Sequence, residues 1–243
     1  MKKPGKADKA VLSKLETQSP KSTESPVARL LQQDATLIQI VDSALTDAAA
    51  RAGKHLACRP GCTQCCYGAF AISPLDAFRL RTAMTELASA DSERAAAISA
   101  RAQSYLAEFG PSFPGDCTTG ILGTREEDQA AFEDFANEAA CPALNPKSGL
   151  CDVYDARPMT CRVFGPPVRT VDDENSADGL AVCELCFSQA TSEEIAAAEM
   201  ILPHAEEQEV LAELEEIEPS AGETIVAYCL TLPLRNGSET IAS

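Results

Sequence analysis

Residues 58–66 read Cys58-Arg59-Pro60-Gly61-Cys62-Thr63-Gln64-Cys65-Cys66, which places four of the chain's 11 cysteines in one short stretch. Four free thiols held this close repel one another as thiolates, and they oxidise when they are exposed. They are therefore expected either to pair as disulfides or to bind a metal. Pro60-Gly61 interrupts any helix at this point, so a turn is predicted over residues 62–66.

The cysteine count and the N-terminus favour metal binding over disulfides. The first residues are basic but lack the apolar segment of a secretory signal, and no apolar run is long enough to span a bilayer. We therefore expect a cytoplasmic location, where structural disulfides are rare. Eleven is also an odd number of cysteines, which cannot all pair within one chain. Metal ions are the expected partners.

The charge balance argues against two other classes of partner. The net charge is -17, and residues 1–27 hold six lysines against three carboxylates, so the remainder is more acidic than the whole. So acidic a body repels phosphate backbones and anionic lipid, and we expect neither nucleic acid nor a membrane surface as a partner. No feature of the sequence identifies a protein partner.

Composition predicts a mainly α fold, with helices around an irregular cysteine-rich metal-binding centre and few short strands. The chain of 243 residues is 45% hydrophobic, lacks Trp and is rich in alanine, which favours closely packed helices. Three parts are expected: a disordered basic tail at 1–27, a cysteine-cluster metal-binding domain with a helical insert at 28–190, and an acidic helical C-terminal extension packed on it at 191–243.

Hydrophobic spacing and capping signals give the elements more locally. The expected helices lie at 28–57, 73–87, 91–110, 124–140, from 158, and from 191 to 217, interrupted at Pro203. Capping boxes are predicted at Thr124 with Glu127 and at Thr191 with Glu194. Short strands are expected at 68–72 and 223–235.

More cysteines are available than one metal ion can use. A four-coordinate site takes two ligands from a turn and two from elsewhere. The plausible ligands are Cys58, Cys62, Cys65, Cys66, Cys141, Cys151, Cys161, Cys183 and Cys186. In extended backbone the neighbours Cys65 and Cys66 would point to opposite sides. Two sites or one multinuclear site are therefore favoured, the alternative being that Cys66 merely packs.

The sequence leaves the metal open between zinc and iron. Thiolates suit Zn(II), iron and iron–sulfur clusters. Cys62-x2-Cys65 is the turn pair, and together with Cys183-x2-Cys186 it resembles the paired C-x2-C ligand spacing of structural zinc sites. Ligation by cysteine alone also suits an Fe–S cluster. The ferredoxin spacings are absent, which favours zinc only weakly. The expected cofactor is Zn(II) or Fe, an Fe–S cluster included.

Other polar residues near the cysteines have two interpretations. Arg157 and Arg162 bracket Cys161 and could offset the negative charge of several thiolates, or they could pair with surface carboxylates. We interpret His55 as a solvent-facing helix residue. We expect Cys117 to be an unliganded thiol and Cys229 a buried, inert one.

The combined motifs resemble the YkgJ-type cysteine-cluster proteins, described as zinc- or iron-chelating domains and mostly without an established activity. The motif is Cys-x3-Cys-x2-Cys-Cys, then Cys-Pro-x-Leu, then Cys-x2-Tyr-x2-Arg-Pro-x2-Cys-Arg-x-Phe. The matching residues are Cys58, Cys62, Cys65, Cys66, Cys141, Pro142, Leu144, Cys151, Tyr154, Arg157, Pro158, Cys161, Arg162 and Phe164. The resemblance covers about 58–165, and an extension to Cys183 or Cys186 stays open. Gly165 stands where that family tends to have Pro, and the insert at 75–140 is long.

The resemblance leaves the biological role open. A related cysteine cluster occurs in flagellin lysine-N-methylases, which implies as an alternative an iron–sulfur or iron-dependent redox or modifying enzyme. No G-x-G-x-x-G follows a strand here to bind a methyl donor. Three roles remain: a protein whose metal holds the fold together, a redox or catalytic iron protein, and a labile metal buffer or carrier.

Overall fold

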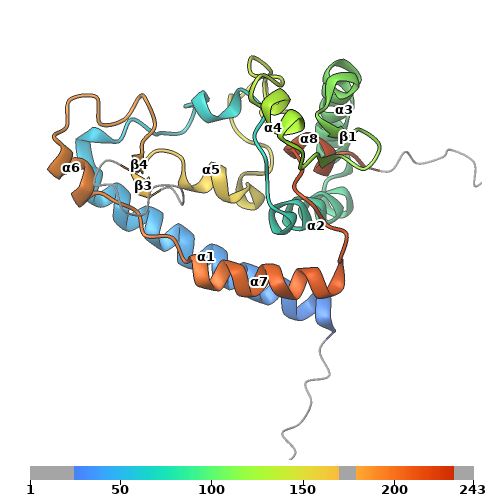
Figure 1. The fold of residues 1–243 in the computed structure, drawn as a ribbon, viewed down its shortest axis with the longest axis horizontal. Helices are drawn as coiled ribbons and strands as arrows, with labels where there is room; N and C mark the ends of the chain where they lie inside the picture. Colours follow the sequence, from blue (N-terminus) through green and yellow to red (C-terminus); the bar gives the residue numbers. More distant parts are fainter. Residues whose placement is uncertain (1–24, 170–178, 233–243) are drawn as a thin grey trace, which may run out of the picture.

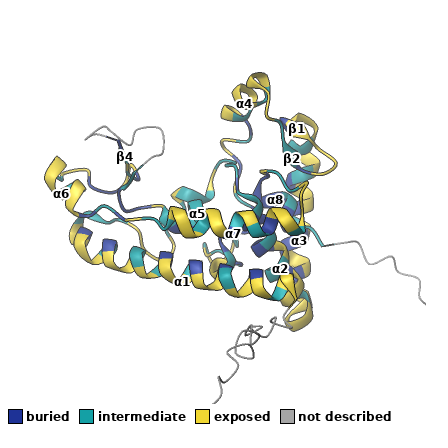
Figure 2. Ribbon diagram, turned by 60° about the horizontal axis from the view of Figure 1, so that its bottom comes forward, coloured by how far each residue is buried: buried dark blue, intermediate teal, exposed yellow. Residues whose placement is uncertain are grey.

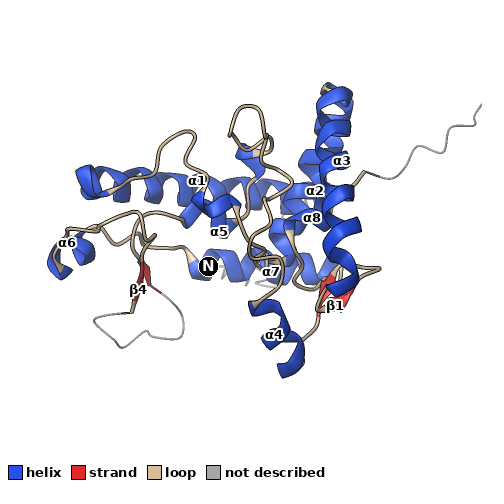
Figure 3. Cartoon of the chain, turned by 90° about the horizontal axis from the view of Figure 1, so that it is seen from above, coloured by secondary structure: helices blue, strands red, loops and turns tan. Residues whose placement is uncertain are grey.

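The computed structural model describes residues 25–169 and 179–232, and in this part of the chain the prediction of a mainly α fold is confirmed (Figures 1 and 3). The helices are α1 (Pro26–Ala52), α2 (Pro74–Ala90), α3 (Ser92–Phe109), α4 (Glu126–Glu133), α5 (Met159–Val163), α6 (Ser192–Ala197), α7 (His204–Ile217) and α8 (Val226–Cys229). Short 3-10 turns are η1 (Gly53–His55), η2 (Gln64–Cys66), η3 (Gly110–Ser112) and η4 (Tyr154–Ala156). Of the predicted tail, residues 1–24 lie outside the described part, and Pro26 already belongs to α1.

The longest element, α1, begins and ends where its sequence predicts. The Ser25 side chain accepts a hydrogen bond from the Ala28 N–H, and Pro26 occupies the first turn, where its missing N–H costs nothing. Gly53 ends the helix with φ of 52°, which favours glycine. One stripe of α1 is buried and the opposite face is exposed (Figure 2). The buried stripe packs Leu30 and Leu37 against α2 and α7.

A second helical layer packs at one end of α1 (Figure 1). The Ser73 and Asp91 side chains cap α2 and α3, as their sequences predict. Leu80 of α2 and Ile98 of α3 form a core with Cys229 of α8. The predicted strand at 223–235 is wrong over its described part, because residues 226–229 form α8; residues 233–235 lie outside the described part.

Three further predictions are corrected by the structure. The strand predicted over 68–72 does not form: Ile72 makes an isolated bridge with Thr224, and Tyr67, just before this segment, makes another with Ala140. The helix predicted over 124–140 is shorter, since α4 ends at Glu133. Its cap is Arg125, without the predicted capping box at Thr124. The capping box at Thr191, by contrast, is confirmed.

The strands of the described part form two small antiparallel pairs. The first pairs β1 (Gly115–Asp116) with β2 (Ile121–Leu122), and the second pairs β3 (Val168–Arg169) with β4 (Leu180–Ala181). They are seen as small red pieces among the helices in Figure 3. No helix among the described residues combines the length and the apolar character that crossing a membrane requires.

Candidate metal centre

Loops and short turns, rather than long helices, carry the nine candidate cysteines. Cys65 and Cys66 lie in η2, so their backbone is a 3-10 turn and not the extended chain that the sequence argument assumed. The expected divergence of their side chains therefore has no basis here, and each of the two thiols shifts the pKa of the other. Adjacent thiols this close can belong to one site.

One set of cysteines, which we call the five-thiol group, consists of Cys65, Cys66, Cys141, Cys151 and Cys161. Backbone hydrogen bonds connect the segments that carry them. The Cys141 N–H donates to the Cys66 carbonyl at 2.7 Å, and the Asp152 N–H donates to the Ala143 carbonyl at 2.8 Å. Cys161 lies in the first turn of α5, as predicted.

Within the five-thiol group the sulfurs are close enough to alter one another's ionisation. The hydrogen bond from Cys66 lowers the pKa of Cys65 to about 6, and the same bond, together with burial, raises the pKa of Cys66. Burial first and neighbouring thiolates second raise the pKa of Cys161 and that of Cys141, the latter to about 11. One thiolate among protonated neighbours is thus the expected state of the group before any metal binds.

The other set, which we call the four-thiol group, consists of Cys58, Cys62, Cys183 and Cys186. Burial, followed by the charges of Cys186, Cys183 and Cys62, raises the pKa of Cys58 to about 12. The Ala57 N–H donates to Cys186 Sγ at 3.3 Å. Seven cysteines of the two groups have a shifted pKa. In each case the other thiols that shift it most belong to the same group.

Gly165 lies against the four-thiol group. Its φ is 124°, and a Cβ at this position would lie 2.8 Å from Cys58 Sγ. Proline, whose φ is fixed near about -65°, could not take this conformation. The glycine at this place, which departs from the family pattern, is therefore required by its own backbone and by the neighbouring thiol.

The two arginines around Cys161 have different surroundings. Arg162 is 1% exposed and donates to both carboxylate oxygens of Asp42 at 2.7 and 2.9 Å, and it also donates to the Asp155 carbonyl. Arg157 lies 3.9 Å above the Tyr154 ring and 3.7 Å from Asp42. Arg162 therefore pairs with a carboxylate of α1. The pKa of Cys65 is lowered first by the hydrogen bond from Cys66 and also by the charge of Arg157, so Arg157 lies close to the thiols.

A buried ionic network, which the sequence analysis missed, holds the turn that carries Cys161. Arg79 donates to Asp34 at 2.5 and 2.8 Å and to Asp76 at 2.6 Å, and all three side chains are buried. Asp76 also accepts from the Met159 N–H, at the start of α5, at 2.9 Å. A signal existed: Asp34 lies at helical spacing within the apolar stripe of Leu30 and Leu37.

Three other residues singled out in the sequence are His55, Cys117 and Cys229. His55 is mostly buried, stacks on Phe187 at 5.7 Å and approaches Glu194 at 3.5 Å, so its interpretation as solvent-facing is wrong. Cys117 is exposed in a loop, and Cys229 is 1% exposed in the apolar core.

The chemistry of the donors fits a soft metal, although the side chains are not arranged around one. Within residues 25–169 and 179–232, no three His, Cys, Asp or Glu side chains already converge on a single ion position. Four and five thiols nevertheless lie within mutual electrostatic reach, with a guanidinium and a backbone N–H beside them. Such donors suit Zn(II) or iron.

Comparison with known proteins identifies the family. A family model for the CxxCxxCC proteins, described as a putative zinc- or iron-chelating domain, matches residues 57–186 and therefore includes Cys183 and Cys186. No curated protein and no solved structure matches the chain. Because the match spans more than half of the chain and contains all nine candidate cysteines, the chain belongs to the CxxCxxCC family of zinc- or iron-chelating domains.

Proposed function

We propose that this protein binds metal at two separate centres, one in the four-thiol group and one in the five-thiol group. The observation that carries the proposal is the division of the thiol influences, which run within each group. The division separates Cys62 from Cys65, which sequence spacing alone would have placed in one site. Under this proposal, four of the nine thiols belong to one metal centre and five to the other.

The four-thiol group has the features of a structural site. Four cysteines, two of them in a C-x2-C turn, match the ligand set of closed tetrahedral zinc sites. Cys183 and Cys186 belong to a buried cluster with Phe187, and Ala52 at the end of α1 packs into the same cluster. A metal here would fasten the 183–187 segment to the end of α1. The Ala57 N–H would stabilise the Cys186 thiolate.

The five-thiol group has more donors than one tetrahedral ion requires. Its thiols come from η2, from the loop that carries Cys141 and Cys151, and from α5. Arg157 supplies a positive charge that partly offsets several thiolates. We propose that it takes zinc or iron, with room in the ligand set for a second ion or an Fe–S cluster. We place the protein in the cytoplasm, because reducing surroundings keep the thiols able to bind metal.

Metal analysis with an absorption spectrum on protein purified without oxygen tests the proposal. We expect zinc or iron to copurify, and chelator treatment to lower the thermal midpoint. Visible absorption that bleaches on reduction would identify an Fe–S or redox iron centre; a colourless preparation would identify zinc. Protein that holds no metal, or that keeps its thermal midpoint after complete metal removal, would refute the structural role.

Cysteine variants test the division into two centres. Cys62→Ser and Cys186→Ser should each remove the metal of the four-thiol group alone, while Cys151→Ser should remove only the metal of the five-thiol group. Cys117→Ser, an exposed cysteine outside both groups, is the matched control and should keep full metal content. If any single ligand variant removed all the metal, one multinuclear site would replace the two proposed centres.

A further inference from the structure

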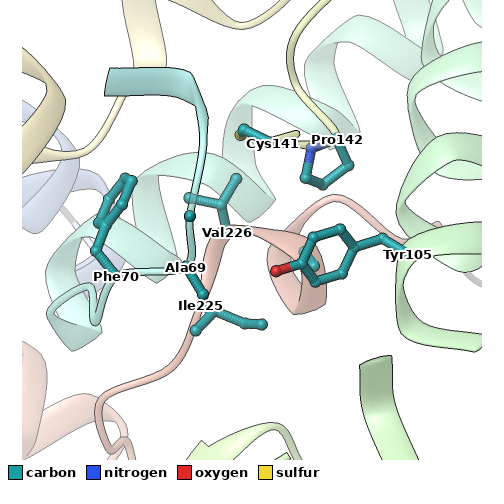
Figure 4. Close-up of a pocket in the computed structure, with 9 residues that line it drawn as sticks. Ala69, Phe70, Tyr105, Cys141, Pro142, Ile225 and Val226 are labelled. Carbon is teal, nitrogen blue, oxygen red and sulfur yellow. The ribbon is translucent and has the colours of Figure 1, made fainter. Parts of the chain in front are cut away.

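A small cavity lies beside Cys141, on the edge of the five-thiol group (Figure 4). It is lined mainly by apolar side chains from three segments, among them Phe70, Pro142, Ile225 and Val226. Its volume is about 20 Å³, just above the roughly 10–15 Å³ needed to hold one water molecule. Cofactors and drug-sized ligands, which need several hundred Å³, are excluded by this size.

One polar side chain points into this apolar cavity. The Tyr105 ring projects from α3, and its hydroxyl is directed between Ile225 and Val226 (Figure 4). The residue is only 9% exposed. No hydrogen bond joins its hydroxyl to another residue of the described part of the chain. A hydroxyl that faces a water-sized space and has no protein partner can hydrogen-bond to whatever fills that space, so the cavity has a reason to contain an acceptor.

Backbone groups at the wall supply further polar partners. Gly68 and Ile72 donate their N–H groups to Ala139 and Thr224, but Ala69 and Phe70, which lie between them, form no hydrogen bond with other described residues. A bound water molecule requires two to four polar partners. The Tyr105 hydroxyl and the backbone of this segment can provide them.

We propose that the cavity is a binding site for one water-sized hydrogen-bond acceptor, held by the Tyr105 hydroxyl beside Cys141. Its ligand is a water molecule or an equally small polar molecule. The bound molecule would be a non-protein neighbour of the five-thiol group, and the cavity would be a place where a small molecule can approach Cys141. The binding site itself does not depend on metal; only its role beside a metal centre rests on the proposed function.

A high-resolution crystal structure of the full chain tests the site, with water as the probe. We expect a solvent peak in the cavity at about 2.5–3.0 Å from the Tyr105 hydroxyl oxygen. Tyr105→Phe should lose this peak. Ala69→Val should also lose it, by filling the space while keeping the hydroxyl. Tyr228→Phe is the matched control, because Tyr228 belongs to the same aromatic core as Tyr105 but its hydroxyl donates to the Cys117 carbonyl. Loss of that hydroxyl should leave the solvent peak in place.

A solution measurement checks the result without crystals. The difference Raman spectrum of wild type minus Tyr105→Phe reports the hydrogen bonding of this hydroxyl through the tyrosine Fermi doublet. A doublet typical of a donating hydroxyl, together with the solvent peak, supports the site. An empty cavity, or a Tyr105 hydroxyl that donates directly to Cys141 or another protein atom, overturns it. Metal-free protein gives the same readouts, so a failure to bind metal would not be mistaken for a failure of this site.

Discussion

Replacing Arg79 by methionine should be among the most damaging single changes away from the cysteines. Arg79 is the cation shared by Asp34 and Asp76, and the three side chains are only 9%, 7% and 4% exposed. Arg79→Met leaves two buried carboxylates facing each other without a counter-charge. Removing one partner of a buried ion pair typically lowers the free energy of unfolding by about 3–5 kcal/mol. Asp34→Asn should cost less, about 1–3 kcal/mol, because the Arg79–Asp76 pair survives.

Urea unfolding followed by circular dichroism measures these losses. Arg81→Met makes the same substitution at an exposed position of the same helix and should stay within about 0.5 kcal/mol of wild type. A loss below about 1 kcal/mol for Arg79→Met, or a loss no larger than that of Arg81→Met, would show that the network does not depend on this cation.

Three further outcomes are expected. Burial, followed by the charge of Asp76, raises the pKa of Glu207. The neutral form of Glu207 favours the folded state and is lost as the pH rises, so Glu207→Gln should unfold at a higher urea concentration than wild type at pH 7. This gain should vanish near about pH 4, where Glu207 is protonated in both states. Gly165→Ala should destabilise the protein by at least about 1–2 kcal/mol and displace Cys58, so metal analysis should show a lower content; unchanged content would contradict the contact. Cys229→Ala should keep its metal while losing about 1 kcal/mol in the same unfolding assay, and loss of metal would make Cys229 a ligand.

Local signals in the sequence located most helices because their caps act locally. Ser73 and Asp91 begin α2 and α3 through side-chain hydrogen bonds to backbone only three residues on. The apolar spacing of α1 also determines which face it buries. The prediction of a capping box at Thr124 failed because a capping box is only one of several ways to begin a helix. Helix α4 begins one residue later than predicted, after Arg125, without such a box.

The nine candidate cysteines could be named from the sequence, but their division into the four-thiol and five-thiol groups could not. Spacing paired Cys62 with Cys65, whereas in the structure Cys62 acts on Cys183 and Cys65 on Cys66. Which distant cysteine joins which group depends on tertiary contacts, such as the bond from the Cys141 N–H to Cys66. Asp42 could not be chosen either, because its partner Arg162 is 120 residues away in the sequence.

The order of the two groups along the chain has a consequence during synthesis. The last thiol of the five-thiol group is Cys161, and the last of the four-thiol group is Cys186, about 25 residues later. At the roughly 5–20 residues per second of translation, the first group is complete about one to five seconds before the second. A scarce metal would therefore meet the five-thiol group on the nascent chain before the four-thiol group is complete. Under the two-centre proposal, the four-thiol group, which closes a loop of more than 100 residues from Cys58, would be loaded last, before α7 and α8 are synthesised and pack on the earlier helices.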